Sequence, residues 1–516
     1  MIRLSRKTCL AVLLVLLGGL PLLAGELTPL QDWPNHLARM QIVDAMRHGD
    51  PFWGRFYQPG SFMVPDVALD AVLLGLLRLG LGIAFAAKLF IAATYLIFVG
   101  GACALAWALR AYDPAKIALA ALLFTSGALF WGLVDYMLGV GLALALLAGW
   151  IAAERPYRRL GIAVAGAAML FFCHLIAAVV FVVLLGCFAV AESLATRPRR
   201  LPGASAVAAL AVVLALRSAS PAADEGLFEM VYAGHGSWGG ILRHKISIIG
   251  YALIGGGLAV DVATLTILLA AIVLLAVAAR VRLARSGVIA VAVLLGMAMA
   301  APERIGTGSQ LDFRLMVLPL LLAVAAMRID WRGRVGRRMV QAALAFGLGA
   351  HSLLLGAAWT ADDAEFQAFD RLAAQWPPGG IALMGFAKPL SQLTFYDFWS
   401  PPLSSLETLA VRRHIFVPIV FANPAEQPLA LRAEFAGLNQ PFDLSSAKAI
   451  AASQLRLAGL CAAWPSVHLT VLYPQPWLRA ALPPLAMQGG TAAFMLLDGC
   501  ALGGAWAMQL APGVGT

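Results

Sequence analysis

The chain has 516 residues, of which 61% are hydrophobic and 12% are charged, and its mean hydropathy is +0.83. A water-soluble protein of this length cannot bury so much apolar surface, so the composition excludes an ordinary soluble fold and indicates a membrane protein. The formal charge of +10 does not indicate a nucleic-acid partner, because the basic residues cluster in short connections between apolar runs, as in cytoplasmic loops.

Apolar segments fill most of the first 359 residues. The first segment follows three basic residues and ends in Leu23-Ala24-Gly25. It has the outline of a cleavable signal peptide, but we interpret it as a retained first span. Because roughly 20 helical residues cross a bilayer, we predict about eleven spans. They cover residues 8–24, 84–109, 117–130, 137–153, 162–172, 176–190, 204–216, 263–279, 288–301, 315–327 and 340–359.

The basic connections predict the orientation of these spans in a bacterial inner membrane. When the Arg-rich loops are placed inside, the N-terminus is cytoplasmic and residues 25–66 form a first periplasmic loop. Every later basic cluster then also falls in the cytoplasm. Parity requires residues 67–81 and 246–258 to lie in the headgroup region, as amphipathic helices can. The last span leads outward, so the rest of the chain is expected in the periplasm.

Residues 360–516 have the mixed composition of a folded soluble domain. The pattern predicts a helix over 362–375 and strands over 381–386, 415–421, 468–473 and 492–497. We therefore predict a polytopic α-helical membrane domain (residues 1–359) followed by a small α/β periplasmic domain (residues 360–516). Cys461 and Cys500 both belong to the second domain, and a disulfide between them would fit an oxidising compartment.

The first periplasmic loop carries a candidate catalytic group. Asp32 is placed to cap a helix that Pro34 helps to start. In that helix Asp32, His36 and Arg39 occupy positions i, i+4 and i+7 and share a face. The carboxylate suits a general base, and the imidazole and guanidinium suit an anionic phosphate. The alternative is that Asp32 only caps the helix while the other two side chains are solvated.

Other ionisable residues near the predicted periplasmic membrane edge are candidates by default, because such groups are costly in hydrocarbon. Asp135 lies between an outgoing and a returning span, and His174 lies at a break between two spans. Glu303, Asp312 and Arg314 belong to a short loop before the next span. The alternatives are a helix cap for Asp135, core packing for His174, and surface ion pairs for the loop residues.

No cofactor is expected. The sequence lacks a Cys-x-x-Cys pair, a His-Glu-x-x-His motif and a helix with paired histidines, so it gives a metal site little support. A divalent cation shared by Asp32 and Asp135 stays open as an alternative. Phosphate-binding loops, dinucleotide fingerprints and nucleophile elbows are also absent from the sequence, so nucleotide hydrolysis and serine-type catalysis have no basis in it.

The segment Gln31-Asp32-Trp33-Pro34-Asn35-His36-Leu37-Ala38-Arg39 is similar to the short Asp-x-x-x-His signature of bacterial GT-C glycosyltransferases. That class includes protein mannosyltransferases and lipid A aminoarabinose transferases. The predicted architecture resembles it too. The resemblance implies that Asp32 is the catalytic base, that Asp135 is a second acidic site residue and that Arg314 faces the lipid phosphate. Protein mannosyltransferases have an Asp-Glu pair at this place, whereas Asp32 is followed by Trp33 in this sequence. The acceptor of the mannosyltransferases is therefore not expected for this chain.

We therefore expect a membrane glycosyltransferase. Its partners would be the bilayer, a polyprenyl-phosphate-linked sugar donor and an envelope glycan, lipid or protein acceptor on the periplasmic side. Two other functions stay open: a lipid or small-solute transporter or flippase, and a non-catalytic envelope-assembly protein that binds lipid-linked sugar. The position of the candidates near helix ends on one side favours the enzyme, because transporters usually carry such groups near the bilayer midplane.

Overall fold

The structure is a computed structural model of the whole chain. The residues that it describes are 5–195, 203–220, 230–231, 237–305, 310–388, 406–407, 412–424, 426–464, 466–472, 474–476, 478, 487–490 and 494–501. The chain divides into two compact units. The first comprises Met1–Ala24 and Ser61–Trp359, and the second comprises Gly25–Gly60 and Thr360–Thr516. Most of the first loop, which the sequence analysis placed with the spans, thus belongs to the second unit.

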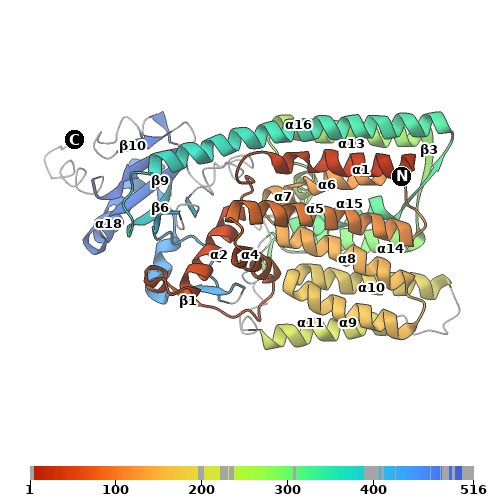
Figure 1. Cartoon of the computed structure of the whole chain (residues 1–516), viewed down its shortest axis with the longest axis horizontal. Helices are drawn as coiled ribbons and strands as arrows, with labels where there is room; N and C mark the ends of the chain where they lie inside the picture. The colour runs from red at the N-terminus through yellow and green to blue at the C-terminus, as the bar shows by residue number, and fades with distance from the viewer. Residues whose placement is uncertain are drawn as a thin grey trace. The chain divides into compact units, whose positions relative to one another are not determined.

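The first unit consists of helices that run alongside one another (Figure 1). Its helices are α1 (Arg6–Gly19), the 3-10 turn η1 (Leu20–Leu23), α4 (Ala68–Arg78), α5 (Ile83–Ala108), α6 (Ala115–Phe124), α7 (Gly127–Phe130), α8 (Val134–Ala152), α9 (Pro156–Cys173), α10 (Leu175–Ala195), α11 (Gly203–Ala219), α12 (Trp238–Tyr251), α13 (Leu258–Ala278), α14 (Arg285–Ala300), α15 (Leu311–Ala326) and the first part of α16 (Arg334–Ala373).

Six helices of the described residues are long and apolar enough to cross a membrane. They are Arg6–Leu23, Ile83–Ala108, Val134–Ala152, Leu175–Leu194, Leu258–Ala278 and Arg334–Ala373. Shorter apolar helices cover Ala115–Phe130, Gly203–Ala219 and Arg285–Ala300. The prediction of a polytopic helical membrane protein is therefore confirmed. Each of the eleven predicted segments falls on a helix, while the number of spans stays a prediction.

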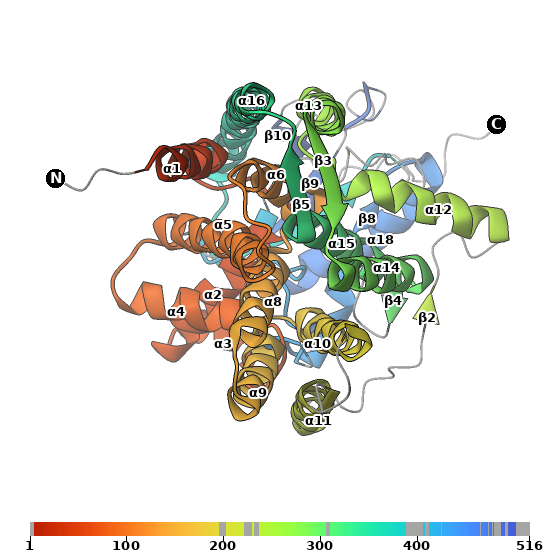
Figure 2. The ribbon, with the colours of Figure 1, turned by 90° about the vertical axis from the view of Figure 1, so that its right-hand side faces the viewer.

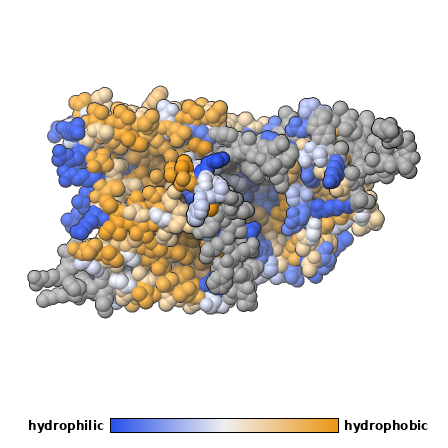
Figure 3. All heavy atoms as spheres, turned by 180° about the vertical axis from the view of Figure 1, so that it is seen from behind, coloured by the Kyte–Doolittle hydropathy of each residue, from blue (hydrophilic) through white to orange (hydrophobic). Residues whose placement is uncertain are grey.

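Apolar side chains cover the outside of this unit. Figure 3 shows a largely hydrophobic surface along the helices and hydrophilic residues at the end of the helices. Leu96, Trp107, Leu269 and Phe346 are among the exposed apolar residues, with 54%, 75%, 63% and 80% of their surface accessible. Exposed apolar area on this scale indicates a lipid-facing surface.

Two small sheets connect the loops at the helix ends. Strand β3 (Ala279–Leu283), which leads from α13 to α14, pairs antiparallel with β5 (Met327–Trp331), which leads from α15 to α16 (Figure 2). Strand β2 (Met230–Val231) pairs with β4 (Arg304–Ile305). The orientation predicted from basic residues places both loops of the first sheet inside and both loops of the second outside. Each sheet thus joins loops assigned to the same side.

The close crossing of α5 and α8 depends on glycine. A Cβ atom at Gly101 would lie 2.1 Å from the Gly141 carbonyl oxygen, and one at Gly141 would lie 2.6 Å from the Phe98 Cα. No side chain fits in that space, so two glycines let the backbones approach, as small residues commonly do between membrane helices.

The second unit contains a mixed sheet and several helices that come from distant parts of the chain. Gly25–Gly60 supplies α2 (Trp33–Arg47), α3 (Pro51–Gly54) and β1 (Tyr57–Pro59), and β1 pairs antiparallel with β7 (Leu429–Leu431). The C-terminal part supplies the end of α16, β6 (Ile381–Phe386), η5 (Ala433–Asn439), β8 (Phe442–Asp443), α18 (Ala447–Ala463), β9 (Val467–Leu472), β10 (Met487–Gly490) and β11 (Phe494–Asp498). The sheet order is β10-β11-β9-β6-β8.

The strands at the centre of this sheet are buried. Strand β6 pairs in parallel with β8 and β9, and every residue of β9 is buried, as expected for a central parallel strand covered on both faces. Aromatic rings hold Gly25–Gly60 to the C-terminal part: Phe56 stacks on Phe416 with ring centroids 4.2 Å apart, and Trp464 stacks on both.

The structure tests the elements that were predicted in the C-terminal part. The strand over 381–386 is confirmed, and those over 468–473 and 492–497 correspond to β9 and β11 as far as the described residues reach. The strand over 415–421 is wrong, because only Phe416 forms an isolated bridge, to Ile381. The helix over 362–375 is the end of the 40-residue helix α16. The amphipathic segment over 246–258 begins earlier, as α12, and ends at Tyr251.

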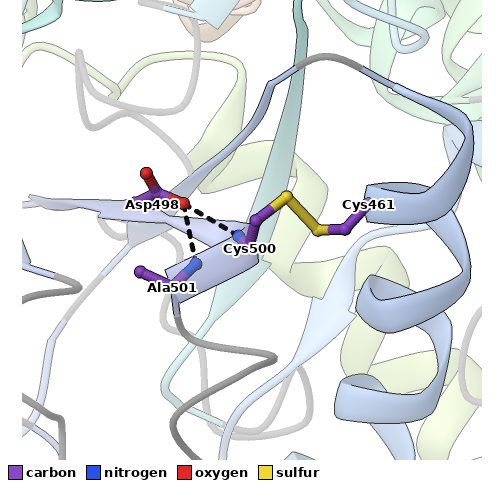
Figure 4. The surroundings of a disulfide bond; sticks show 4 residues. All are labelled: Cys461, Asp498, Cys500 and Ala501. Carbon is purple, nitrogen blue, oxygen red and sulfur yellow. Dashed lines mark hydrogen bonds between the residues drawn. A yellow bond between two sulfur atoms is a disulfide. The ribbon is translucent and has the colours of Figure 1, made fainter.

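A disulfide joins Cys461 of α18 to Cys500 after β11, with the two Cα atoms 5.6 Å apart (Figure 4). The Asp498 carboxylate accepts hydrogen bonds of 2.9 Å from the backbone amides of Cys500 and Ala501. This turn fixes the position of Cys500, and the disulfide then ties the last described strand to α18.

Candidate functional site

The first unit brings three predicted site residues together. Arg314 Nη1 lies 2.8 Å from His174 Nε2, and the Tyr136 hydroxyl donates a hydrogen bond of 2.6 Å to the Arg314 carbonyl oxygen. Asp66, which the sequence analysis did not single out, has Oδ2 3.9 Å from His174 Nε2. One ligand atom from each of Asp66, Asp135 and His174 lies within 4.8 Å of the others. We call these residues the carboxylate–arginine cluster: Asp66, Asp135, Tyr136, His174 and Arg314.

Helix ends position this cluster. Asp135 lies in the first turn of α8 and Arg314 in the first turn of α15. His174 has an extended backbone between α9 and α10, so its ring leaves the helical path at the break noted in the sequence. Asp66 has a φ of 66°, a left-handed conformation that aspartate tolerates better than most residues. Its Oδ1 accepts a hydrogen bond of 3.0 Å from the Leu175 amide at the start of α10.

Two hydrogen-bond donors compete for His174 in this cluster. Both His174 nitrogens face donors, Arg314 Nη1 at Nε2 and the Ile176 amide at Nδ1, 3.2 Å away. A neutral imidazole has one acceptor nitrogen, so the two bonds exclude each other. Arg314 Nε is buried and has no partner among the described residues. An anion beside Arg314 would satisfy these donors, because a guanidinium offers a fork of N–H groups that fits phosphate.

The same cluster offers ligands to a divalent cation. Two carboxylate oxygens and one imidazole nitrogen are a donor set for Mn²⁺ or Zn²⁺, and the carboxylates alone suit harder ions. Donor atoms about 2.1 Å from one ion can be at most about 4.2 Å apart, so atoms up to 4.8 Å apart need only a small contraction. Asp32, the partner that the sequence analysis considered for Asp135 in a cation site, belongs to the second unit.

Asp312 and Glu303 have other contacts. Asp312 is 1% exposed and its Oδ2 accepts hydrogen bonds from Lys245 Nζ at 2.5 Å and His244 Nε2 at 2.9 Å. This ion pair fixes α12 against α15, and Asp312 does not pair with Arg314 in the described residues. The Glu303 carbonyl oxygen accepts a hydrogen bond of 2.9 Å from the Leu311 amide. No described contact joins the Glu303 side chain to Arg314. These contacts do not test the substrate-binding roles that were predicted for Asp312 and Glu303.

The second unit holds the other predicted residues. Asp32 is the N-cap residue of α2, but its side chain makes no capping hydrogen bond. The alternative in which the Asp32 carboxylate only caps the helix would require such a bond. Arg39 Nη2 lies 3.0 Å from His36 Nδ1, and Arg39 is 1% exposed. Because arginine can only donate, His36 accepts at Nδ1 and a neutral His36 carries its proton on Nε2. The His36 ring also packs edge-on against Phe421.

Asn35 and Glu407 complete the surroundings of Asp32, and the sequence analysis missed both. Asn35 Nδ2 donates to Ile419 O at 3.0 Å and to Glu407 Oε1 at 3.4 Å, and Asn35 Oδ1 accepts from the Phe421 amide at 2.5 Å. Burial is the main cause that raises the pKa of the Glu407 carboxyl to about 8, and the charge of Asp32 acts in the same direction. Glu407 was not found because it lies far along the chain in a segment with no periodic pattern, and Asn35 was not found because its partners lie in that distant part of the chain.

The fold of this chain also occurs among solved structures. The chain is similar to ArnT from Cupriavidus metallidurans bound to undecaprenyl phosphate, with a TM-score of 0.51 and 14% identity over 95% of this chain and 97% of that chain. Against apo ArnT from the same organism the TM-score is 0.53 and the identity 14%, over 96% and 98%. No protein-family model matches the sequence, and no curated protein matches it either.

ArnT is a GT-C glycosyltransferase, so the fold that the sequence resemblance implied is confirmed. At 14% identity the similarity establishes the fold alone. The roles of individual residues therefore rest on the geometry of this chain.

Proposed function

We propose that this protein is a membrane glycosyltransferase that moves a sugar from a polyprenyl-phosphate donor to an acceptor of the cell envelope. The observation that carries the proposal is the carboxylate–arginine cluster, in which Arg314 has a buried donor with no partner among the described residues. A lipid phosphate supplies the missing acceptors. The fold shared with ArnT, which has been crystallised with undecaprenyl phosphate, supports the same lipid carrier.

In the proposed reaction Arg314 binds the phosphate of the donor. Its Nη1 and Nε donate charge-assisted hydrogen bonds to phosphate oxygens, and these bonds strengthen as the bond between the sugar carbon and the phosphate oxygen breaks and negative charge grows on the leaving group. His174, released from Arg314, keeps its Nδ1 as the acceptor for the Ile176 amide and presents N–H at Nε2. Both residues thus stabilise the departing lipid phosphate.

Asp32 is the proposed general base. A hydroxyl or amine of the acceptor attacks the anomeric carbon and loses its proton to the Asp32 carboxylate. The lipid phosphate leaves with the bonding electron pair, so the charges balance without an oxidant or another reactant.

The proposed location of the chemistry is the periplasmic side of the inner membrane. The carboxylate–arginine cluster is built from segments that the charge pattern assigns to the outside. The disulfide between Cys461 and Cys500 supports an oxidising compartment for the second unit, because cytoplasmic proteins rarely keep such bonds.

The test is transfer of labelled sugar from undecaprenyl-phosphate donors by membranes that contain the full-length protein. We expect Asp32→Asn to lower the transfer rate by about 10²- to 10⁴-fold, the usual contribution of a general base. Asp44→Asn is the matched control, since Asp44 lies on the same helix and pairs with His48 at 3.7 Å. Unchanged turnover in Asp32→Asn would remove Asp32 as the base.

The same assay separates the two other functions. A flippase would move the intact lipid-linked sugar across vesicles without forming a new glycoside, and an envelope-assembly protein would bind it without turnover. Product formation that depends on Asp32 is expected only of the transferase.

A further inference from the structure

The carboxyl group of Glu407 is buried in the second unit, and the proposed reaction leaves it without a role. Glu407 is 5% exposed. Its Oε1 accepts one long hydrogen bond from Asn35, and its Oε2 is buried with no hydrogen-bond partner among the described residues. An ionised carboxylate can accept about four hydrogen bonds, and burying it with so few is costly. The group is therefore held in its neutral form, with a proton.

Asn35 connects Glu407 to the helix turn that carries Asp32. Asn35 lies in the first turn of α2, three residues after Asp32, and is 5% exposed. Its amide also bonds the backbone of Ile419 and Phe421. The first turn of α2 is thus attached on one side to residues 419–421 and on the other to Glu407. A displacement of Glu407 loosens one of these attachments.

The charged groups around Glu407 also favour its protonated form. Asp32 is the charged group of α2 that raises the pKa of Glu407, while Arg39 and His36 on that helix are paired with each other. Two neighbouring carboxyl groups resist double ionisation. Burial and the neighbouring charge of Asp32 thus both favour the protonated form of Glu407.

We propose that Glu407 is a positioning residue for the transfer reaction: as a neutral acid it holds Asn35 and the first turn of α2, and so keeps the Asp32 carboxylate in place for proton abstraction. The proposal rests on the proposed function of Asp32. Glu407 itself does not touch the substrate. When it ionises, the charged group requires hydration and leaves its buried place, and Asn35 loses this partner.

The first test is the pH dependence of sugar transfer by the full-length protein. Wild-type activity is expected to fall above pH of about 8, by about tenfold for each further pH unit once the ionised form dominates. Glu407→Gln cannot ionise and its amide keeps an acceptor for Asn35, so this variant is expected to retain activity there. Glu407→Ala removes the acceptor and is expected to lower kcat at every pH, and Glu407→Gln rescues that loss.

Glu434→Gln is the matched control, because Glu434 is an exposed glutamate of the same unit. It is expected to behave as wild type at each pH. A Glu407→Gln variant with the same alkaline loss as wild type would overturn the positioning role, as would a Glu407→Ala variant with full kcat.

The second test does not need turnover. Burial raises the pKa of Glu407 from 4.5 to about 8, so the stability of the folded state relative to the unfolded state falls as pH rises through this range. The melting midpoint of purified Glu407→Gln should match that of wild type at pH 4.5 and exceed it increasingly up to pH of about 8. A difference that does not change with pH overturns the neutral state of Glu407. If wild type transfers no sugar, the proposed function fails while this measurement still tests Glu407.

Discussion

Replacing Arg314 by lysine separates the charge of this side chain from its geometry. Lysine keeps the positive charge but offers a single ammonium in place of the guanidinium fork. In the structure, Arg314 Nη1 faces His174 at 2.8 Å, and Nε is buried without a partner among the described residues. Two donors are therefore available to a phosphate, and lysine can replace only part of their contribution.

The expected loss of binding free energy follows from the hydrogen bonds of these two donors. A hydrogen bond to a charged group contributes about 1.5 to 3 kcal/mol. Losing one of them in Arg314→Lys costs about 1.5 to 3 kcal/mol, which raises the Kd by roughly 10- to 150-fold. The melting midpoint of the variant is expected to stay near that of wild type, because the charge in the cluster is preserved.

The assay is equilibrium binding of labelled undecaprenyl phosphate to the purified full-length protein. Arg304→Lys is the matched control, since Arg304 is an exposed arginine that precedes the same helix, and it should change the Kd by less than about twofold. Undecaprenol, which lacks the phosphate, should bind wild type and Arg314→Lys equally. Wild-type affinity in Arg314→Lys, or an equal loss with undecaprenol, would refute phosphate recognition by Arg314.

Three further predictions follow from other parts of the structure. Chelation of divalent cations should weaken undecaprenyl phosphate binding if Asp66, Asp135 and His174 hold an ion, and Asp66→Asn should abolish the sensitivity of binding to a chelator. Reduction of the Cys461–Cys500 disulfide, which spans 39 residues, should destabilise the second unit by up to about 4 kcal/mol, seen as a lower melting midpoint. Gly141→Ala should cost about 1 to 3 kcal/mol in detergent unfolding, because its Cβ would lie 2.6 Å from Phe98 Cα; Gly149→Ala, whose Cβ would meet Ile162 at 3.9 Å, should be neutral.

The sequence predicts the helices well because each helix is indicated by residues that follow one another in the chain. Each of the eleven apolar segments falls on a helix, since the run of apolar residues that makes a helix stable in lipid is continuous along the chain. The strand expected over 415–421 fails for the opposite reason. Its Phe416 packs against Phe56 and Trp464 through its ring, and the pattern alone does not distinguish such packing from a regular strand.

The site could be predicted only in part. Asp135, His174 and Arg314 were found because ionisable residues at membrane edges stand out against apolar neighbours. Asp66 and Glu407 were missed because each is a single acidic residue outside the apolar segments, where such residues are common. Their importance arises from folding, which places Asp66 beside the start of α10 and Glu407 beside Asn35, 372 residues away in the chain.

Charge balance distinguishes a structural ion pair from a binding site in this protein. Asp312 receives the Lys245 ammonium and the His244 imidazole within 2.9 Å, so its charge is compensated within the protein. In the carboxylate–arginine cluster, by contrast, the carboxyl groups of Asp66 and Asp135 offer ligands to a cation, and the buried Nε of Arg314 offers a donor to an anion. A divalent cation held by these carboxylates would place positive charge beside Arg314, and the anionic phosphate of a lipid-linked donor would then bind more tightly.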